Sequence, residues 1–266
     1  MILLGAVQGA TEFLPVSSSG HLAVGQLLGG RAADDSPLLF EVLVHVATLL
    51  AVIVVYRRDV LDLIRGGGRG LGALFRGSIR AAVQDDAGVN LALCVAAGTL
   101  PTGILGLALR HPAEMIAASP QGLGLAFLAL AALLLGSRGW TGGTRRLDWK
   151  VALIIGTVQG VAVLPAISRS GVTIVTALAL GLDRAEAARF SFLLAIPAIL
   201  GAALLEIEPG AIAVGGQVLP LALSSLTAFA VGLVALLLLL RLVKSGRLWL
   251  FTPYVAAMGI FSLVWL

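Results

Sequence analysis

Apolar segments fill most of the chain, and polar residues gather in the connections between them. About 20 apolar residues in a helix are enough to cross a bilayer core about 30 Å thick. This criterion predicts full spans at residues 38–56, 88–109, 121–137, 190–205, 218–240 and 249–266. We therefore expect an all-α polytopic membrane protein.

Two pairs of shorter apolar segments interrupt this series of spans. Residues 2–15 and 21–29 are each too short to cross and are joined by a serine-rich turn, and residues 151–164 and 172–181 flank a similar turn. Such backbone is tolerated at membrane depth only where it lines a cavity or is buried in protein. The pattern predicts two re-entrant helical hairpins.

The two hairpins resemble each other in sequence. Aligned without gaps, Val7–Gly20 and Val158–Gly171 share Val-Gln-Gly at the start and Ser-x-Ser-Gly at the end. A six-residue match alone can arise by chance, but Phe40-Glu41 and Leu49–Val52 are also echoed downstream, by Phe190-Ser191 and Leu193–Ile196. We predict one integral membrane domain, residues 1–266, built from two homologous halves at about 1–137 and 151–266.

Charge supports the membrane prediction and orients the spans. The chain is 59% hydrophobic and 12% charged, with a mean hydropathy of +1.03, whereas soluble domains carry about 25% charged residues. If each hairpin returns to the side it entered, the loops 57–86, 138–150, 182–189 and 241–247 share one side and hold fifteen of the 18 Lys and Arg residues. The opposite side holds only Arg31 and Arg110. This split predicts that the basic side is cytoplasmic, and it makes the hairpins an inverted-topology repeat whose tips meet near the midplane.

Several other functions and features are not expected from the sequence. The pI near 10 reflects loop bias rather than nucleic-acid binding, and the single Cys94 allows no disulfide framework. The N-terminus lacks the basic region of a cleavable signal peptide.

The glycine-rich run in 57–86 has no phosphate-loop context, so we expect a flexible loop there, with room for an interfacial helix. We expect a short turn at Arg110–Glu114 and a polar link at Asp183–Arg189. Glycines within the spans fit tight helix contacts and leave a homodimer open.

The remaining cation, Arg169, lies at the tip of the second hairpin. A guanidinium at membrane depth is costly and suits a bidentate grip on phosphate oxygens. Ser168, Ser170 and Thr173 add hydroxyls, and the helix N-termini after the two tips favour an anion. The alternative is a structural ion pair between Arg169 and Glu12.

The first hairpin carries the complementary groups. Gln8 and Glu12 are four residues apart, on one helix face, and offer oxygen ligands for a phosphate-linked Mg²⁺ or Ca²⁺, which Glu41 could join. The alternative is that Glu12 and Glu41 are buried, hydrogen-bonded acids with a structural role only. His21 follows three serines closely enough for a Ser–His pair, or it caps a helix. His45 we interpret as structural.

These motifs resemble the undecaprenyl-diphosphate phosphatases of the bacitracin-resistance type. The likeness rests on Gln8-x-x-x-Glu12-Phe-Leu-Pro-Val-Ser-Ser-Ser-Gly-His21 and on Pro165-Ala-Ile-Ser-Arg-Ser-Gly-Val-Thr173, with support from Phe40-Glu41 and Phe190–Pro197. It covers essentially the whole chain. Two positions depart from the family pattern: Gln8 stands where many members have Glu, and Ala166 replaces the usual Gly.

The resemblance implies a multi-pass enzyme of the bacterial cytoplasmic (inner) membrane. It would remove the terminal phosphate of undecaprenyl diphosphate at a site open to the outer (periplasmic) face, with a divalent metal, and return the lipid carrier to peptidoglycan synthesis. By position, the resemblance makes Ser18 the nucleophile and His21 its base or acid, gives Glu12 and Gln8 a part in metal binding, and has Arg169 hold the diphosphate. Further phosphate contacts would come from Ser17, Ser168, Ser170 and Thr173. Broken helices at the midplane are also typical of transporters, so a lipid-phosphate or anion transporter without hydrolysis is the alternative.

Overall fold

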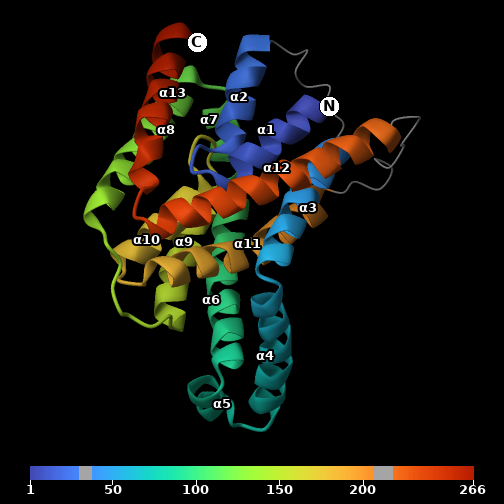
Figure 1. Cartoon of the computed structure of the whole chain (residues 1–266), viewed down its shortest axis with the longest axis vertical. Helices are drawn as coiled ribbons and strands as arrows, with labels where there is room; N and C mark the ends of the chain where they lie inside the picture. Colours follow the sequence, from blue (N-terminus) through green and yellow to red (C-terminus); the bar gives the residue numbers. More distant parts are fainter. Residues whose placement is uncertain (30–37, 207–217) are drawn as a thin grey trace.

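The computed structural model describes residues 1–29, 38–206 and 218–266, and these are helical with no strand among them. Arg31, which we placed on the side opposite the basic loops, lies outside the described residues. The helices, shown in Figure 1, are α1 (Ile2–Phe13), α2 (Ser18–Gly29), α3 (Leu38–Val55), α4 (Arg57–Phe75), α5 (Ile79–Asp85), α6 (Ala87–Ala108), α7 (Arg110–Ala117), α8 (Pro120–Gly136), α9 (Trp149–Val161), α10 (Arg169–Ala179), α11 (Arg184–Glu206), α12 (Val218–Lys244) and α13 (Thr252–Trp265).

The predicted multi-pass membrane architecture is confirmed. Within the described residues, five helices are long and apolar enough to cross a membrane, namely α6, α8, α11, α12 and α13. A sixth candidate is α3 together with α4, which are bent by 90° relative to each other. The short helices α1 and α2, and likewise α9 and α10, form the two predicted hairpins.

The prediction of a flexible loop at residues 57–86 is wrong, because this segment forms α4 and α5. One of its glycines is a packing site: a Cβ on the buried Gly66 would lie 2.1 Å from the carbonyl oxygen of Gly88 on α6. Asp86 caps α6, and Arg69 bonds the same carboxylate at 2.6 Å. That hydrogen bond, with help from the α6 backbone, lowers the pKa of Asp86 below its ordinary value.

Two shorter connections are also helical rather than irregular. The expected turn after residue 109 is α7, where Arg110 and Glu114 lie one helical turn apart at 3.9 Å. The expected polar link at 183–189 is mostly the first turns of α11, whose N–H groups are capped by the Asp183 carboxylate at 2.8 and 3.1 Å. In Figure 1, α7 lies beside α2, at the opposite end of the molecule from the α4–α5 projection.

The two halves pack in the same way around close glycine contacts. Helix α1 lies along α12, and a Cβ on Gly5 would come 2.4 Å from the Ser224 carbonyl oxygen. Gly156 is the gapless equivalent of Gly5, and its Cβ would lie 2.0 Å from the Gly98 carbonyl oxygen, since α9 lies along α6. Helices α8 and α13, one from each half, meet through Gly124 and Gly259. The glycine contacts thus correspond between the two segments. The homologous halves, the single domain and the opposite orientation of the two hairpins in the membrane stay predictions.

Candidate active site

The turns between the helices of each hairpin, here called the first elbow (Leu14–Ser17) and the second elbow (Ala162–Ser168), are closed by the same contacts. The Ser17 hydroxyl accepts the Gly20 N–H at 3.2 Å, and the Ser168 hydroxyl accepts the Gly171 N–H at 3.2 Å. Each elbow contains one non-glycine residue in the left-handed region, Ser17 at φ +66° and Ala166 at φ +65°. Such a residue costs about 1–2 kcal/mol, so surrounding contacts must hold it.

The surrounding contacts come from the other hairpin. A Cβ on Gly20 would lie 2.7 Å from the Ala166 Cα, and a Cβ on Gly171 would lie 3.1 Å from the Pro15 Cβ. The Ser170 hydroxyl also donates to the Phe13 carbonyl oxygen at 2.7 Å. The hairpin tips therefore meet, as the sequence predicted.

The Glu12 carboxylate lies at the junction of the two elbows, with only 3% of its side chain exposed. Arg169 from the second hairpin forms an ion pair with Oε1. Gln8 donates to Oε2 at 2.9 Å, and the Ser18 hydroxyl donates to Oε2 at 3.2 Å. Ser18 and Arg169 occupy equivalent positions in the two repeats, so the two halves place a hydroxyl and a guanidinium on one carboxylate. The ion pair that a structural role of Arg169 requires is thus present.

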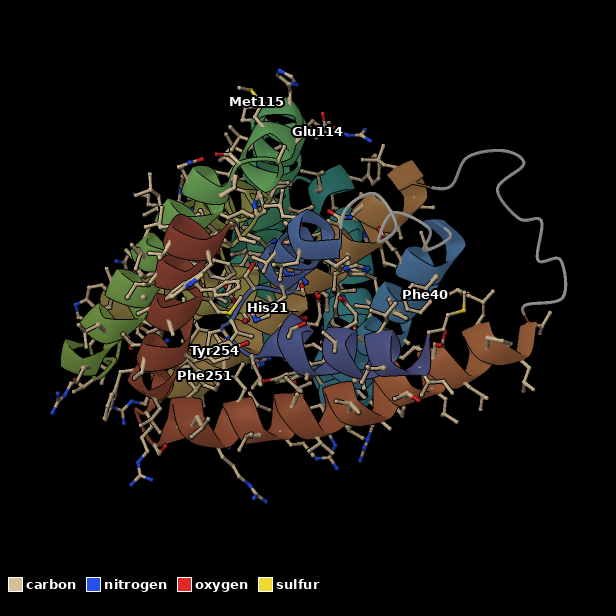
Figure 2. All side chains as sticks on the ribbon, turned by 90° about the horizontal axis from the view of Figure 1, so that it is seen from above. His21, Phe40, Glu114, Met115, Phe251 and Tyr254 are labelled. Atoms are coloured by element: carbon tan, nitrogen blue, oxygen red, sulfur yellow. The ribbon has the colours of Figure 1, made fainter. Side chains whose placement is uncertain are left out.

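His21 is held in a different way from the predicted Ser–His pair. Its Nδ1 lies 2.7 Å from the Ser17 carbonyl oxygen and its Nε2 lies 2.6 Å from the Tyr254 hydroxyl. A carbonyl oxygen only accepts, so Nδ1 carries the proton and the neutral ring accepts the tyrosine O–H at Nε2. Figure 2 shows Tyr254 of α13 next to His21, with the rings stacked at 5.7 Å. In the structure as described, Ser18 bonds Glu12 rather than His21.

His45 was interpreted as structural, and the structure places it in the site. Its Nε2 lies 3.2 Å from the Gln8 amide nitrogen and 3.8 Å from Glu12 Oε2. Its Nδ1 lies 2.8 Å from the carbonyl oxygen of Glu41, one turn earlier on α3. Sequence reasoning also missed Tyr254, because nothing within one apolar helix identifies its partner on another. The His45 signal was available, since an imidazole inside a span is as costly as the polar groups that we did single out.

A model of the bacitracin resistance protein BacA family matches residues 1–261. The chain belongs to the BacA family. An undecaprenyl-diphosphatase of Desulfosudis oleivorans is 47% identical over 263 residues, covering 97% of this chain and 94% of its own. The corresponding protein of Korarchaeum cryptofilum is 43% identical over 261 residues, with 97% and 95% covered, and that of Treponema denticola is 40% identical over 263 residues, with 97% and 94% covered.

In this BacA-family protein, the buried hydroxyls of the second elbow maintain its shape. Ser168 caps α10, Ser170 bonds the first hairpin, and Thr173 bonds the Arg169 carbonyl oxygen at 2.7 Å and also contacts Ser191. Ser17 does the same in the first elbow. The groups that keep some exposure are Ser18, Ser19, His21, His45 and Arg169. Phosphate contacts by the buried hydroxyls stay a prediction.

The donor set around Glu12 fits a divalent cation. Within the described residues, no group of three or more His, Cys, Asp or Glu side chains could hold a metal. Phosphate-linked Mg²⁺, however, needs only one or two carboxylates because substrate and water complete its coordination. Glu12, Gln8 and His45 place three donor groups within 3.8 Å of one another. A carboxylate ligand from Glu41 stays a prediction.

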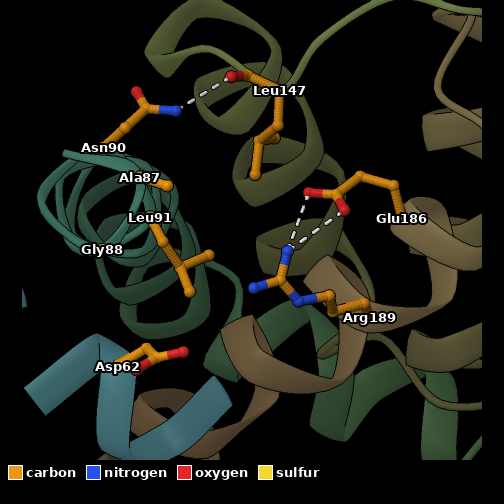
Figure 3. Close-up of a pocket in the computed structure, with 8 residues that line it drawn as sticks. All are labelled: Asp62, Ala87, Gly88, Asn90, Leu91, Leu147, Glu186 and Arg189. Atoms are coloured by element: carbon orange, nitrogen blue, oxygen red, sulfur yellow. Dashed lines mark hydrogen bonds and ion pairs between the residues drawn. The ribbon is translucent and has the colours of Figure 1, made fainter. Parts of the chain in front are cut away.

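Two cavities differ in what they could do. The smaller one, about 10 Å³, borders Glu12 and Arg169 and has room for about one water. The larger one, about 160 Å³, lies between α4, α6 and α11 and is lined by Asp62, Asn90 and Glu186, among others (Figure 3). Its Arg189 is already paired with Asp59 at 2.6 Å and with Glu186 at 3.2 Å. We therefore take the elbows as the candidate active site despite the smaller volume, because a hydroxyl and a cation share one carboxylate there.

Proposed function

We propose that this protein is an undecaprenyl-diphosphatase, an integral membrane hydrolase that converts undecaprenyl diphosphate to undecaprenyl phosphate and phosphate and so recycles the lipid carrier of cell-wall synthesis. Full-length relatives bearing that name support the assignment. The observation that carries it is the placement of Ser18 and Arg169 on the two oxygens of Glu12. A transporter without hydrolysis has no need of that hydroxyl.

Binding of the diphosphate requires a change of partner at Arg169. Phosphoryl transfer depends mainly on positioning and on neutralising spread negative charge. With one-quarter of its side chain exposed, Arg169 can turn from Glu12 to the phosphate oxygens and hold them in bidentate fashion. The N-termini of α2 and α10 begin at Ser18 and Arg169, so their free N–H groups favour the same anion.

The reaction then proceeds in two steps, formation of a phosphoserine and its hydrolysis. The Ser18 oxygen bonds the terminal phosphorus, the bond from that phosphorus to the bridging oxygen breaks, and undecaprenyl phosphate leaves. The Ser18 proton passes to Glu12, which already accepts its hydrogen bond. Water next attacks the phosphoserine and gives its proton to His21 Nε2, which releases the Tyr254 hydroxyl. Glu12 returns a proton to the Ser18 oxygen, phosphate leaves, and His21 then passes its proton to solvent. A divalent ion, when bound through other lone pairs of Glu12, would neutralise phosphate charge.

Phosphate release by the purified protein in detergent tests the proposed activity. Wild type should release phosphate from undecaprenyl diphosphate, and a transporter would release none. Ser18→Ala should lose turnover by at least about 10³-fold, whereas Ser19→Ala, the neighbouring exposed hydroxyl, serves as the matched control. Near-normal turnover of Ser18→Ala would leave direct attack by an activated water as the mechanism.

We also propose that the site opens to the outer face of the cytoplasmic membrane, because the arginine-rich α4–α5 projection fits the cytoplasmic side. The single Cys94 is buried, so it gives little background for cysteine labelling. In sealed, right-side-out vesicles, an impermeant maleimide should label Ala118→Cys, after α7, and spare Ser78→Cys, between α4 and α5. The opposite pattern would invert the assignment. A homodimer is a further proposal, which light scattering in detergent tests.

A further inference from the structure

His45 lies outside both sequence motifs, yet its side chain contacts Glu12 and Gln8. His45 comes from α3, and its Nε2 faces the corner formed by these two side chains. We propose that His45 is a nitrogen ligand of a divalent metal ion that Glu12 and Gln8 also bind, an inference that rests on the proposed function. The ion site therefore has a mixed oxygen and nitrogen donor set.

The spacing of the three groups suits one ion. The Gln8 amide nitrogen lies 2.9 Å from Glu12 Oε2 and 3.2 Å from His45 Nε2. Glu12 Oε2 and His45 Nε2 are 3.8 Å apart. A point equidistant from all three lies about 2 Å from each, which is the distance at which Mg²⁺ and Zn²⁺ hold oxygen and nitrogen. Without an ion, the Gln8 amide donates to two acceptors. A half-turn of the amide presents its oxygen to the ion.

The imidazole is already prepared for ligation. Nδ1 donates to the Glu41 carbonyl oxygen at 2.8 Å, so in the neutral ring the lone pair is on Nε2, toward Glu12. Metal-binding histidines nearly always use their second nitrogen in this way, because the hydrogen bond fixes tautomer and ring direction. The His45 carbonyl oxygen in turn accepts the buried Thr48 hydroxyl at 2.9 Å.

This donor set predicts a preference among metals. One carboxylate, one amide oxygen and one imidazole give a single negative charge, and Arg169 occupies the other oxygen of Glu12. Ca²⁺ favours several oxygen ligands, whereas imidazole suits transition metals. The site should therefore bind Mn²⁺ more tightly than Ca²⁺, and a phosphate group would complete the coordination.

Pulsed electron paramagnetic resonance of bound Mn²⁺ tests the proposal directly, because it detects a coordinated ¹⁴N without any turnover. The protein is purified without a histidine tag and loaded with one equivalent of Mn²⁺. Wild type should show imidazole ¹⁴N modulation. His45→Gln should lose the modulation and bind Mn²⁺ at least about 10-fold more weakly by calorimetry. His111→Gln, the exposed histidine of α7, is the matched control and should retain both.

The outcomes separate this inference from the proposed function. Wild type that releases phosphate but binds no Mn²⁺, or binds it without ¹⁴N modulation, overturns the metal role of His45 and leaves the phosphatase proposal in place. If the ¹⁴N modulation survives in His45→Gln and disappears in His21→Gln, the nitrogen ligand is His21 and the inference about His45 is overturned. A ¹⁴N signal in a protein that releases no phosphate supports the site and contradicts the proposed function. Elution and helicity like those of wild type show that each variant is folded.

Discussion

Replacing Arg169 separates its two roles, the ion pair with Glu12 and the grip on phosphate. Arg169→Gln leaves the Glu12 carboxylate, which is 3% exposed, without its opposite charge. Breaking a buried ion pair by removing one partner costs about 3–5 kcal/mol, and Arg169 keeps one-quarter of its side chain exposed, so we expect about 3 kcal/mol. Arg169→Lys keeps the charge beside Glu12, and the free energy of unfolding should stay within about 1 kcal/mol of wild type.

Arg169→Lys should lose activity although it keeps its stability. Lysine cannot form the bidentate contact of a guanidinium, and one hydrogen bond to a charged group contributes about 1.5–3 kcal/mol. Turnover of Arg169→Lys should therefore fall by about 10- to 100-fold, although its fold is intact. Arg169→Gln should lose both properties.

Denaturant unfolding and phosphate release, measured on the same detergent preparations, check both expectations. Arg110→Gln is the control for loss of an arginine, because this side chain is 71% exposed on α7. Wild-type turnover in Arg169→Lys would refute the phosphate grip and leave Arg169 as a structural partner of Glu12. Unchanged stability of Arg169→Gln would refute the reasoning about the buried carboxylate.

Three further predictions, one of them with a matched control variant, test other parts of the structure. Tyr254→Phe removes the hydroxyl that bonds His21 Nε2, so turnover should fall about 10-fold with little change in KM, as expected of a positioning residue. Gly156→Ala forces a Cβ to within 2.0 Å of a backbone oxygen on α6 and should lower the free energy of unfolding by about 1–3 kcal/mol. Gly103→Ala meets open space and should not lower it, because alanine favours a helix over glycine. Asp86→Asn should cost stability at neutral pH but not in strong acid. The lowered pKa of Asp86 means that its contribution is complete above its ordinary pKa and disappears as pH falls through the folded value.

The elbows could be predicted because burying a polar group is costly wherever it occurs in an apolar chain. Gln8 and Glu12 on one helix face, the two Ser-x-Ser-Gly turns, and Arg169 as the cation left over from the loops each stand out against their surroundings. The repeat then indicated that the tips converge. The contacts between Gly20 and Ala166 and between Gly171 and Pro15 agree with that prediction.

Helix α4 could not be predicted in the same way, because local propensity was overridden by packing. Five glycines between Gly66 and Gly72 weaken an isolated helix by about 1 kcal/mol each relative to alanine. In the folded chain the absence of a side chain at Gly66 lets α4 approach the backbone of α6 closely. Tyr254 was missed because its partner lies 233 residues away in sequence, and hydropathy carries no information about which spans are neighbours.

The two halves share a scaffold but divide the charges of the site between them. In the gapless alignment Glu12 corresponds to Val163, and Ser18 corresponds to Arg169, so the first half supplies the carboxylate and the second supplies the cation. Either half alone would expose Glu12 or Arg169 to the membrane interior without its counter-charge, at a cost of several kcal/mol. The reciprocal contacts of the elbows bring the charges together, which makes assembly of the repeat a condition for assembly of the site. A diphosphate that takes Arg169 away from Glu12 replaces one anion by another, so the charge of Arg169 stays neutralised while the Glu12 carboxylate becomes available for proton transfer.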